Sequence, residues 1–339
     1  MKILPSYSAF ARILALGSLI VLGAYAQAQA QTDPLPSWND GPAKQAILTF
    51  VKETTTQASP KFVDPVARIA TFDQDGTTWV EQPLYSQVMF AFHQVGVMSA
   101  KDPKLKTIEP FKTVLSGESA AIAKLTVPDL EKILAVTHTG MTVEVFQKSV
   151  QDWITTAQHP RFHHLYTELV YQPMLEVMQL LRANGFKIYI VTGGGQDFVR
   201  VYSERVYGIP REQVVGSTAD TTFGYDKDGK SELTKVSKDV RVDDKTGKPI
   251  GIHLMIGRRP LAAFGNSTGD QEMLEYSQDG AGARLMMLVH HDDATREYAY
   301  GPESKVGTFS DALMAEANKR GWVVISMKND WKRIFAWER

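Results

Sequence analysis

The chain of 339 residues contains no cysteine. This absence excludes disulfide bonds, thiol catalysis, thiolate metal sites and iron–sulfur clusters. The sequence also lacks an excess of charge of either sign, because 37 Lys and Arg residues nearly balance 38 Asp and Glu residues and leave a formal net charge of -1. This near balance gives no indication of a nucleic-acid partner or of binding to an anionic membrane.

The apolar run over residues 13–22 is too short for a comfortable membrane span. It follows the basic residues Lys2 and Arg12 and precedes small residues in A-x-A patterns over 24–30. This layout is typical of a secretory signal peptide. We therefore expect residues 1–30 to be removed and the mature protein to be periplasmic or secreted, where a chain without cysteine avoids mispairing. An uncleaved anchor is the weaker alternative, and the cleavage site stays open.

The most informative stretch is a strand-like run over residues 67–72 that stops at the sequence Asp-Gln-Asp-Gly-Thr over 73–77. Alternate residues of a strand face the same way, so the two carboxylates just beyond its end can converge on one ligand. Converging acids repel each other, which suggests a bound cation or a shared proton. An EF-hand beginning at Asp73 is excluded, because its sixth and twelfth positions hold Thr78 and Leu84. A plain Asx turn remains the alternative while this stretch is taken alone.

Two later strand-like runs, over residues 186–191 and 261–264, also end in polar residues and glycines. Between them lies Lys248, beside a proline at the expected start of a helix. In parallel α/β sheets, ligands bind at the carboxyl ends of strands, so these strand ends together predict one site. The polar and glycine residues at these ends are Thr192, Gly193 and Gly194 after the first run and Asn266 and Asp270 after the second.

Together these stretches resemble the haloacid dehalogenase (HAD) superfamily phosphatases, and among them the phosphoserine phosphatase-like branch, over roughly residues 66–288. The resemblance implies an α/β fold: a Rossmann-like core with a central, mostly parallel sheet, a helical cap inserted after the first strand and a small β-hairpin insert. It also implies Mg²⁺ as cofactor. The residues that it assigns are catalytic Asp73, Asp75, Thr192 and Lys248, substrate-binding Glu81, Gly193 and Gly194, and metal-binding Asp73, Asp75, Asn266 and Asp270.

The roles that the resemblance implies suit these residue types. Asp73 matches the nucleophile that becomes an aspartyl-phosphate, and Asp75 matches the general acid and base. Thr192 matches the hydroxyl that holds the transferring phosphoryl group, and Lys248 matches the lysine that neutralises charge at the nucleophile. Halide-removing relatives lack the second acid, so the presence of Asp75 favours a phosphatase.

Three positions leave alternatives open. The family has an acid where this chain has Asn266; an amide oxygen still ligates a hard cation, but one negative charge is lost, and either Asn266 or Asp270 is the direct ligand. Spacing does not separate Lys245 from Lys248, and we favour Lys248 because the proline after it suits the first turn of a helix. Glu81 is one residue out of alignment with a substrate-amine-binding glutamate, and a charge at a helix N-terminus is an equal alternative.

Composition and periodicity predict a core with an inserted cap. Hydrophobic residues make up 43% and charged residues 22%, as is usual for a globular protein, and the length allows a large core and an accessory domain. Apolar residues at helical spacing over 82–161 favour a helical cap, and the alternation of helix and strand around 186–191 favours a parallel sheet. The predicted parts are a signal peptide 1–30, core 31–81, cap 82–165 and core 166–339 with a β insert about 218–246. Further predicted elements are one helix over 196–207, strands over 283–289 and 323–327, and a helix over 311–319.

We therefore expect an exported Mg²⁺-dependent phosphomonoesterase that hydrolyses a small phosphorylated metabolite through an aspartyl-phosphate. A phosphotransferase with the same intermediate, and a non-catalytic periplasmic binding protein on the same fold, are the alternatives. The expected partner is the small substrate, with neither nucleic acid nor, after signal cleavage, a membrane. Substrate identity and oligomeric state stay open, because periodicity does not identify the side chains that line the cap.

Overall fold

The computed structural model describes residues 33–338, and everything from Leu35 onward belongs to one compact unit. The predicted signal peptide over residues 1–30 lies outside the described residues. Over the described part of the chain, no helix combines the length and the apolar character that crossing a membrane requires.

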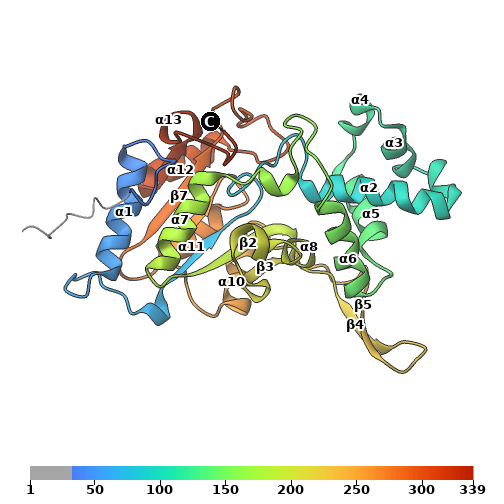
Figure 1. The fold of residues 1–339 in the computed structure, drawn as a ribbon, viewed down its shortest axis with the longest axis horizontal. Helices are drawn as coiled ribbons and strands as arrows, with labels where there is room; N and C mark the ends of the chain where they lie inside the picture. Colours follow the sequence, from blue (N-terminus) through green and yellow to red (C-terminus); the bar gives the residue numbers. More distant parts are fainter. Residues whose placement is uncertain (1–32, 339) are drawn as a thin grey trace, which may run out of the picture. The chain divides into compact units, whose positions relative to one another are not determined.

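The centre of the fold is a six-stranded sheet (Figure 1). Its strands have the order β3-β2-β1-β6-β7-β8. Every neighbouring pair in it is parallel. Parallel strands covered on both faces are apolar along their whole length, and β1, β6 and most of β7 are buried in this way. The strands are β1 Ile69–Phe72, β2 Lys187–Gly195, β3 Val214–Ser217, β6 Ala262–Gly265, β7 Leu285–His290 and β8 Val323–Ser326. The predicted α/β fold with a mostly parallel, Rossmann-like sheet is confirmed.

Helices cover the two faces of the sheet, and alternate residues of each strand enter two separate apolar cores. Phe72 and Phe264 point to one face, where their rings stack with centroids 4.2 Å apart, and α1 and α7 pack over that face. Ala263 and Leu288 point to the other face, which α10, α11 and α12 cover. The core helices are α1 Pro42–Thr55, α7 Gln172–Ala183, α8 Gln196–Arg200, α9 Ser203–Tyr207, α10 Gly247–Met255, α11 Gln271–Gln278, α12 Asp311–Arg320 and α13 Met327–Asp330.

The strand order brings the three predicted strand ends together. β1 lies between β2 and β6, with Phe72 in register with Ile190 on one side and with Phe264 on the other. The chain enters the sheet at β1, continues to β2 and β3 on one side and returns to β6 on the other. This reversal is a topological switch point, where open α/β sheets form their ligand crevice.

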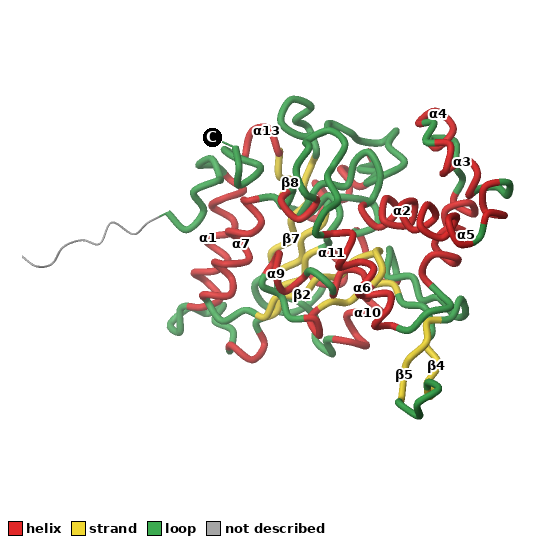
Figure 2. Tube along the Cα trace, turned by 45° about the vertical axis from the view of Figure 1, so that its right-hand side comes forward, coloured by secondary structure: helices red, strands yellow, loops and turns green. Residues whose placement is uncertain are grey.

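A helical insertion separates β1 from α7, and a two-stranded hairpin follows β3 (Figures 1 and 2). The insertion has its own small apolar cluster, in which Ala91 and Val95 of α2 contact Ile133 of α5. Its helices are α2 Ser86–Lys101, α3 Phe111–Ser116, α4 Ser119–Ile122, α5 Val127–His138 and α6 Val143–Ile154. The hairpin strands are β4 Thr221–Tyr225 and β5 Ser231–Lys235, paired antiparallel.

Two predicted elements differ in the structure. The strand predicted over 186–191 continues to Gly195, and its register with β3 shifts between Thr192 and Gly195, as in a bulge. The helix predicted over 196–207 is divided into α8 and α9, because Tyr202 leaves the helical conformation. Tyr202 is fully buried, where its ring stacks on Trp79, and such tertiary contacts outweigh helix propensity.

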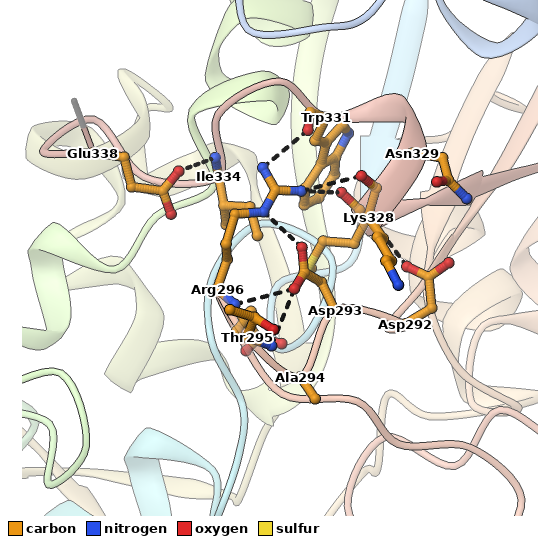
Figure 3. A network of polar contacts seen from close by, with 12 residues as sticks. Asp292, Asp293, Ala294, Thr295, Arg296, Lys328, Asn329, Trp331, Ile334 and Glu338 are labelled. Carbon is orange, nitrogen blue, oxygen red and sulfur yellow. Dashed lines mark hydrogen bonds and ion pairs between the residues drawn. The ribbon is translucent and has the colours of Figure 1, made fainter.

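The segment after β7 is fastened to the C-terminal residues by Arg296 (Figure 3). Its Nε donates to Asp293 Oδ2 at 2.6 Å, and its guanidinium also donates to the carbonyl oxygens of Met327 and Trp331. Asp293 Oδ1 accepts from two backbone N–H groups of the same turn. A bridging guanidinium with several partners holds a loop in one conformation. This loop therefore leads residues 297–307 back to the carboxyl end of the sheet in a defined path.

Candidate active site

Eight of the nine predicted site residues line one cavity of about 270 Å³ at the carboxyl ends of β1, β2 and β6. The structure brings all nine of them to this region, although they come from five separate stretches of the chain. Asn266 lies immediately behind the lining, in contact with Glu81. The residues of the cavity wall are Asp73, Asp75, Glu81, Tyr85, Gln87, Val88, Leu134, Thr192, Gly193, Gly194, Val242, Asp244, Lys248, Ser267 and Asp270.

Lys248 connects Asp73, which follows β1, with Asp270, which follows β6. Its Nζ donates to Asp73 Oδ1 at 2.6 Å, lies 2.8 Å from Asp270 Oδ1 and donates to the Val191 carbonyl at 2.8 Å. Burial alone would lower the pKa of Lys248, but the carboxylates of Asp270 and Asp73 outweigh burial and raise it. The lysine therefore stays cationic against Asp73. Of the two lysines that spacing left open, the structure places Lys248 here, whereas Lys245 is exposed.

Asp75 is held in a different environment from Asp73. Its Oδ1 accepts a hydrogen bond from Trp79 Nε1 at 2.8 Å. Burial raises the pKa of Asp75 to about 6, although Trp79 and Lys248 oppose the shift. A carboxyl group with a pKa near 6 is present in both protonation states around neutral pH, which suits a general acid that later acts as a base.

The surroundings of Asp73 disfavour the ionised form of its side chain. Burial and the neighbouring carboxylate of Asp270 raise its pKa well above the ordinary value, and Lys248 only partly opposes them. One ammonium group thus faces several carboxylates. An added cation or a cationic partner would relieve this excess of negative charge.

Thr192 and the glycines after it form the opposite wall. Thr192 is buried, and its Oγ1 accepts from the Gly194 N–H at 3.0 Å. The Gly195 N–H donates to Gln87 Oε1 of the helical insertion at 2.7 Å. A Cβ at Gly195 would meet the Gln87 side chain at 2.7 Å, so the amide of Gln87 would have to shift if this residue were not glycine.

Asn266 and Asp270 are both buried but make different contacts. Asp270 Oδ2 accepts from the backbone N–H groups of Asn266 and Ser267, which closes the turn after β6. Asn266 Oδ1 accepts from Thr77 Oγ1 at 3.0 Å, and its Nδ2 donates to Glu81 Oε1 at 2.7 Å. The motif at the end of β6 is therefore bonded to the loop after β1 through side chains alone.

Glu81 does not have the exposed position expected of a helix N-terminal charge. It precedes α2 by five residues and is only 2% exposed, so that alternative is wrong. Its Oε1 accepts from Tyr300 Oη at 2.6 Å as well as from Asn266. Burial raises the pKa of Glu81, an effect that the Tyr300 hydrogen bond opposes and that Asp75 and Asp73 reinforce.

Sequence reasoning missed the residues that support the loop after β1. His291 is buried, and its ring nitrogens lie 2.7 Å from the Gly76 carbonyl oxygen and 3.1 Å from Glu297 Oε2. Its ring stacks on Tyr300 with centroids 4.4 Å apart. The run His290–Asp293 was visible in the sequence, but adjacent histidines without a spaced partner carry no metal signal, and no local pattern links them to residue 76.

The oxygen-rich walls fit a hard cation better than a soft one, since they offer carboxylates and an amide but neither histidine nor thiolate. Within the range 33–338, no three or more His, Asp or Glu side chains are grouped so that they alone could hold a metal ion. Mg²⁺ characteristically takes one or two carboxylates and completes its shell with water and substrate phosphate. The predicted metal-binding residues, Asp73, Asp75, Asp270 and the Asn266 amide oxygen, are the groups that would hold it here.

The HAD family model, described as haloacid dehalogenase-like hydrolase, matches residues 70–275. This match spans most of the chain and includes Asp73, Thr192, Lys248 and Asp270. The chain therefore belongs to the haloacid dehalogenase-like hydrolases, and the predicted superfamily and the predicted hydrolase class are confirmed.

One solved structure shows the same fold at low sequence identity, and two others are more distantly similar. A functionally unknown protein from Anaerococcus prevotii DSM 20548 is 14% identical with a TM-score of 0.53, covering 86% of this chain and 94% of that one. A protein of unknown function from Bordetella pertussis Tohama I is 18% identical with a TM-score of 0.45, covering 76% and 97%. A phosphoserine phosphohydrolase-like protein from Francisella tularensis subsp. tularensis SCHU S4 is 16% identical with a TM-score of 0.39, covering 74% and 98%. Among curated proteins, none is a recognisable sequence relative.

Proposed function

We propose that this protein is a Mg²⁺-dependent phosphomonoesterase of the phosphoserine phosphatase-like branch that acts through an aspartyl-phosphate on Asp73. One observation carries the proposal. Asp73, paired with Lys248 at 2.6 Å, shares a cavity with Asp75, a second acid whose pKa lies near 6. Binding alone does not need an acid and base beside a nucleophile, so this pair argues against a non-catalytic binding protein.

The residues suggest a two-step reaction. In the first step, a carboxylate oxygen of Asp73 attacks phosphorus, the ester P–O bond breaks, and the leaving alkoxide takes the proton of Asp75. In the second step, water attacks phosphorus and gives its proton to the Asp75 carboxylate. The bond between Asp73 and phosphorus then breaks, which releases inorganic phosphate and restores both aspartates.

Charge neutralisation supplies most of the catalysis in phosphoryl transfer. Lys248, Thr192, Gly193 and Gly194 line the cavity, and an ammonium, a hydroxyl and backbone N–H groups would supply this neutralisation. A bound Mg²⁺ would add Lewis-acid polarisation of a phosphoryl oxygen. Asp73, Asp75, Asp270 and Asn266 would hold this cation. Lys248 would limit repulsion among the carboxylates before it binds.

The proposed substrate is a small phosphorylated metabolite. The cavity of about 270 Å³ lies between the sheet edge and the helical insertion, which contributes Gln87, Val88 and Leu134 to its wall. A cavity of this size suits a small molecule rather than a polymer. The signal-like sequence over residues 1–30 supports export to the periplasm or beyond as part of the same proposal.

Hydrolysis of an aryl phosphate by the purified protein, with and without divalent cation, tests the proposal. We expect turnover with Mg²⁺ and loss of turnover after exhaustive chelation, with recovery when Mg²⁺ is restored. Full activity after chelation would eliminate the cation mechanism. Adding small alcohols as acceptors and assaying new phosphoesters distinguishes phosphotransfer from hydrolysis, since both pass through the same intermediate.

A further inference from the structure

The loss of an acid at Asn266 leaves the candidate cation site one negative charge short of the family pattern. The structure places a carboxylate directly beside this position, because Asn266 Nδ2 donates to Glu81 Oε1 at 2.7 Å. The two residues lie 185 positions apart in the sequence. A carboxyl group is thus present beside Asn266, but it comes from the loop after β1 and not from the turn after β6.

The Glu81 side chain is fixed in place by its neighbours. Both hydrogen bonds that it accepts from described side chains, from Asn266 and from Tyr300, reach Oε1. Glu81 also belongs to the cavity wall, so Oε2 is the oxygen through which it can act there. A Cβ at Gly76 would approach Oε1 to 2.2 Å, and one at Gly307 would collide with it as well, so two glycines make room for this carboxylate.

The support for Glu81 comes from beyond the part of the chain that the family model matches. Tyr300 donates to Oε1 at 2.6 Å and stacks on His291, which contacts the Gly76 carbonyl in the loop after β1. The Arg296 network described above fixes the same segment (Figure 3). Tyr300 and His291 therefore hold the Glu81 carboxylate in place by hydrogen bonding and stacking. Metal sites commonly orient their ligands through such neighbouring residues.

We propose that Glu81 supplies the carboxylate charge that the cation site lacks at Asn266, so that Glu81 and Asn266 together replace the family's acid. This inference rests on the proposed function, because it concerns the cation of that same site. Asn266 keeps the amide oxygen as a neutral donor, and its Nδ2 holds Glu81 in place. Glu81 is then a cation-site residue rather than a group that binds a substrate amine.

Moving the carboxylate from position 81 to position 266 tests the proposal. We compare wild type, Glu81→Gln, Asn266→Asp and the double variant by titrating Mg²⁺ into the purified chain without substrate, using calorimetry. Glu81→Gln should weaken Mg²⁺ binding by about 10- to 100-fold, the usual range for loss of a supporting group at a metal site. The double variant restores the carboxylate at position 266 and should bind within about 3-fold of wild type.

Glu176→Gln is the matched control, because Glu176 is also buried but accepts its hydrogen bonds from Ser37 and Gln172, and it lies outside the cavity wall. Its Mg²⁺ affinity should equal that of wild type. Melting temperatures without metal report on folding of each variant. If Glu81→Gln alone does not fold, the double variant decides the matter, since it carries the same total charge as wild type.

Equal Mg²⁺ affinity of Glu81→Gln and wild type would overturn the proposal. So would a double variant that binds Mg²⁺ no more tightly than Glu81→Gln. A raised KM for amine-bearing phosphates with unchanged Mg²⁺ affinity would overturn it in favour of substrate-amine binding. Absence of Mg²⁺ binding by wild type would instead refute the cation mechanism itself, so failure of this inference and failure of the proposed function give different results.

Discussion

The carboxyl end of the sheet and the helical insertion line the same cavity with different kinds of residues. The carboxyl end of the sheet provides charged groups, most of them buried, and Lys248 pairs there with Asp73 and Asp270. The insertion provides Gln87, Val88 and Leu134, and its own interior is an apolar cluster. Charges fixed by mutual contacts cannot change without loss of chemistry, whereas neutral wall residues can vary. We therefore expect substitutions in the core to impair the reaction and substitutions in the insertion to alter the choice of substrate.

The largest expected effect is at the nucleophile. Asp73→Asn should lower turnover by at least about 10⁴-fold, as removal of a nucleophile does in other hydrolases, because an amide does not form the acyl-phosphate. Steady-state hydrolysis of an aryl phosphate measures this. Beryllium fluoride, as a mimic of the intermediate, should bind wild type and not the variant. Wild-type turnover by a folded Asp73→Asn protein would remove Asp73 from the mechanism.

Substitution of the second acid should have a smaller effect that depends on the leaving group. Asp75→Asn should slow hydrolysis of alkyl phosphates by about 10²–10⁴-fold, and of aryl phosphates by less, because an alkoxide needs a proton more than a phenolate does. Rapid quenching should reveal accumulated phosphoenzyme with an aryl substrate, since water then lacks its base. Equal losses for both substrate classes without phosphoenzyme would contradict the acid and base role.

A change in the insertion should alter substrate use more than chemistry. Gln87→Ala removes the acceptor of the Gly195 N–H and one part of the cavity wall. We expect KM to rise by about 3- to 10-fold, with kcat nearly unchanged, because one neutral contact is worth about 1 kcal/mol. Gln94→Ala, on the same helix but outside the wall, is the control. A large fall in kcat with constant KM would mean that the insertion takes part in the chemical step.

The smallest effect concerns the interior of the insertion. Burial lowers the pKa of His138 to about 3, and Lys235 contributes in the same direction. Between about pH 6.5 and 3 the unfolded chain binds a proton there that the folded chain does not. Stability from this group is therefore present at neutral pH and lost as pH falls. From pH 7 to 5 the loss should be about 2 kcal/mol in wild type and absent in His138→Gln.

Thermal or urea unfolding at the two pH values measures this difference. The exposed His93 of α2 provides the matched control, because the same His-to-Gln change is made there on the surface of the insertion. An identical pH dependence in wild type and His138→Gln would show that His138 is not kept neutral by the fold.

Much of the site could be predicted from the sequence because strand ends carry local signals. The apolar run before Asp73 and the glycines after Thr192 predict neighbouring loops at one sheet edge, and the structure brings these residues to one cavity. Two local predictions were incomplete. The end of β2 and the break between α8 and α9 depend on Ser217 and Trp79, which lie on other elements.

By itself, the sequence determined the class of fold, the polar strand ends and the absence of thiol chemistry, since these follow from composition and from short-range periodicity. Only the tertiary structure decided that Lys248 rather than Lys245 meets Asp73. It alone also placed Glu81 against Asn266 and Tyr300. These pairs are joined across well over a hundred residues, and no periodic or local pattern encodes such a contact. It arises only when the strand order and the turns that follow the strands bring distant loops to the same edge of the sheet.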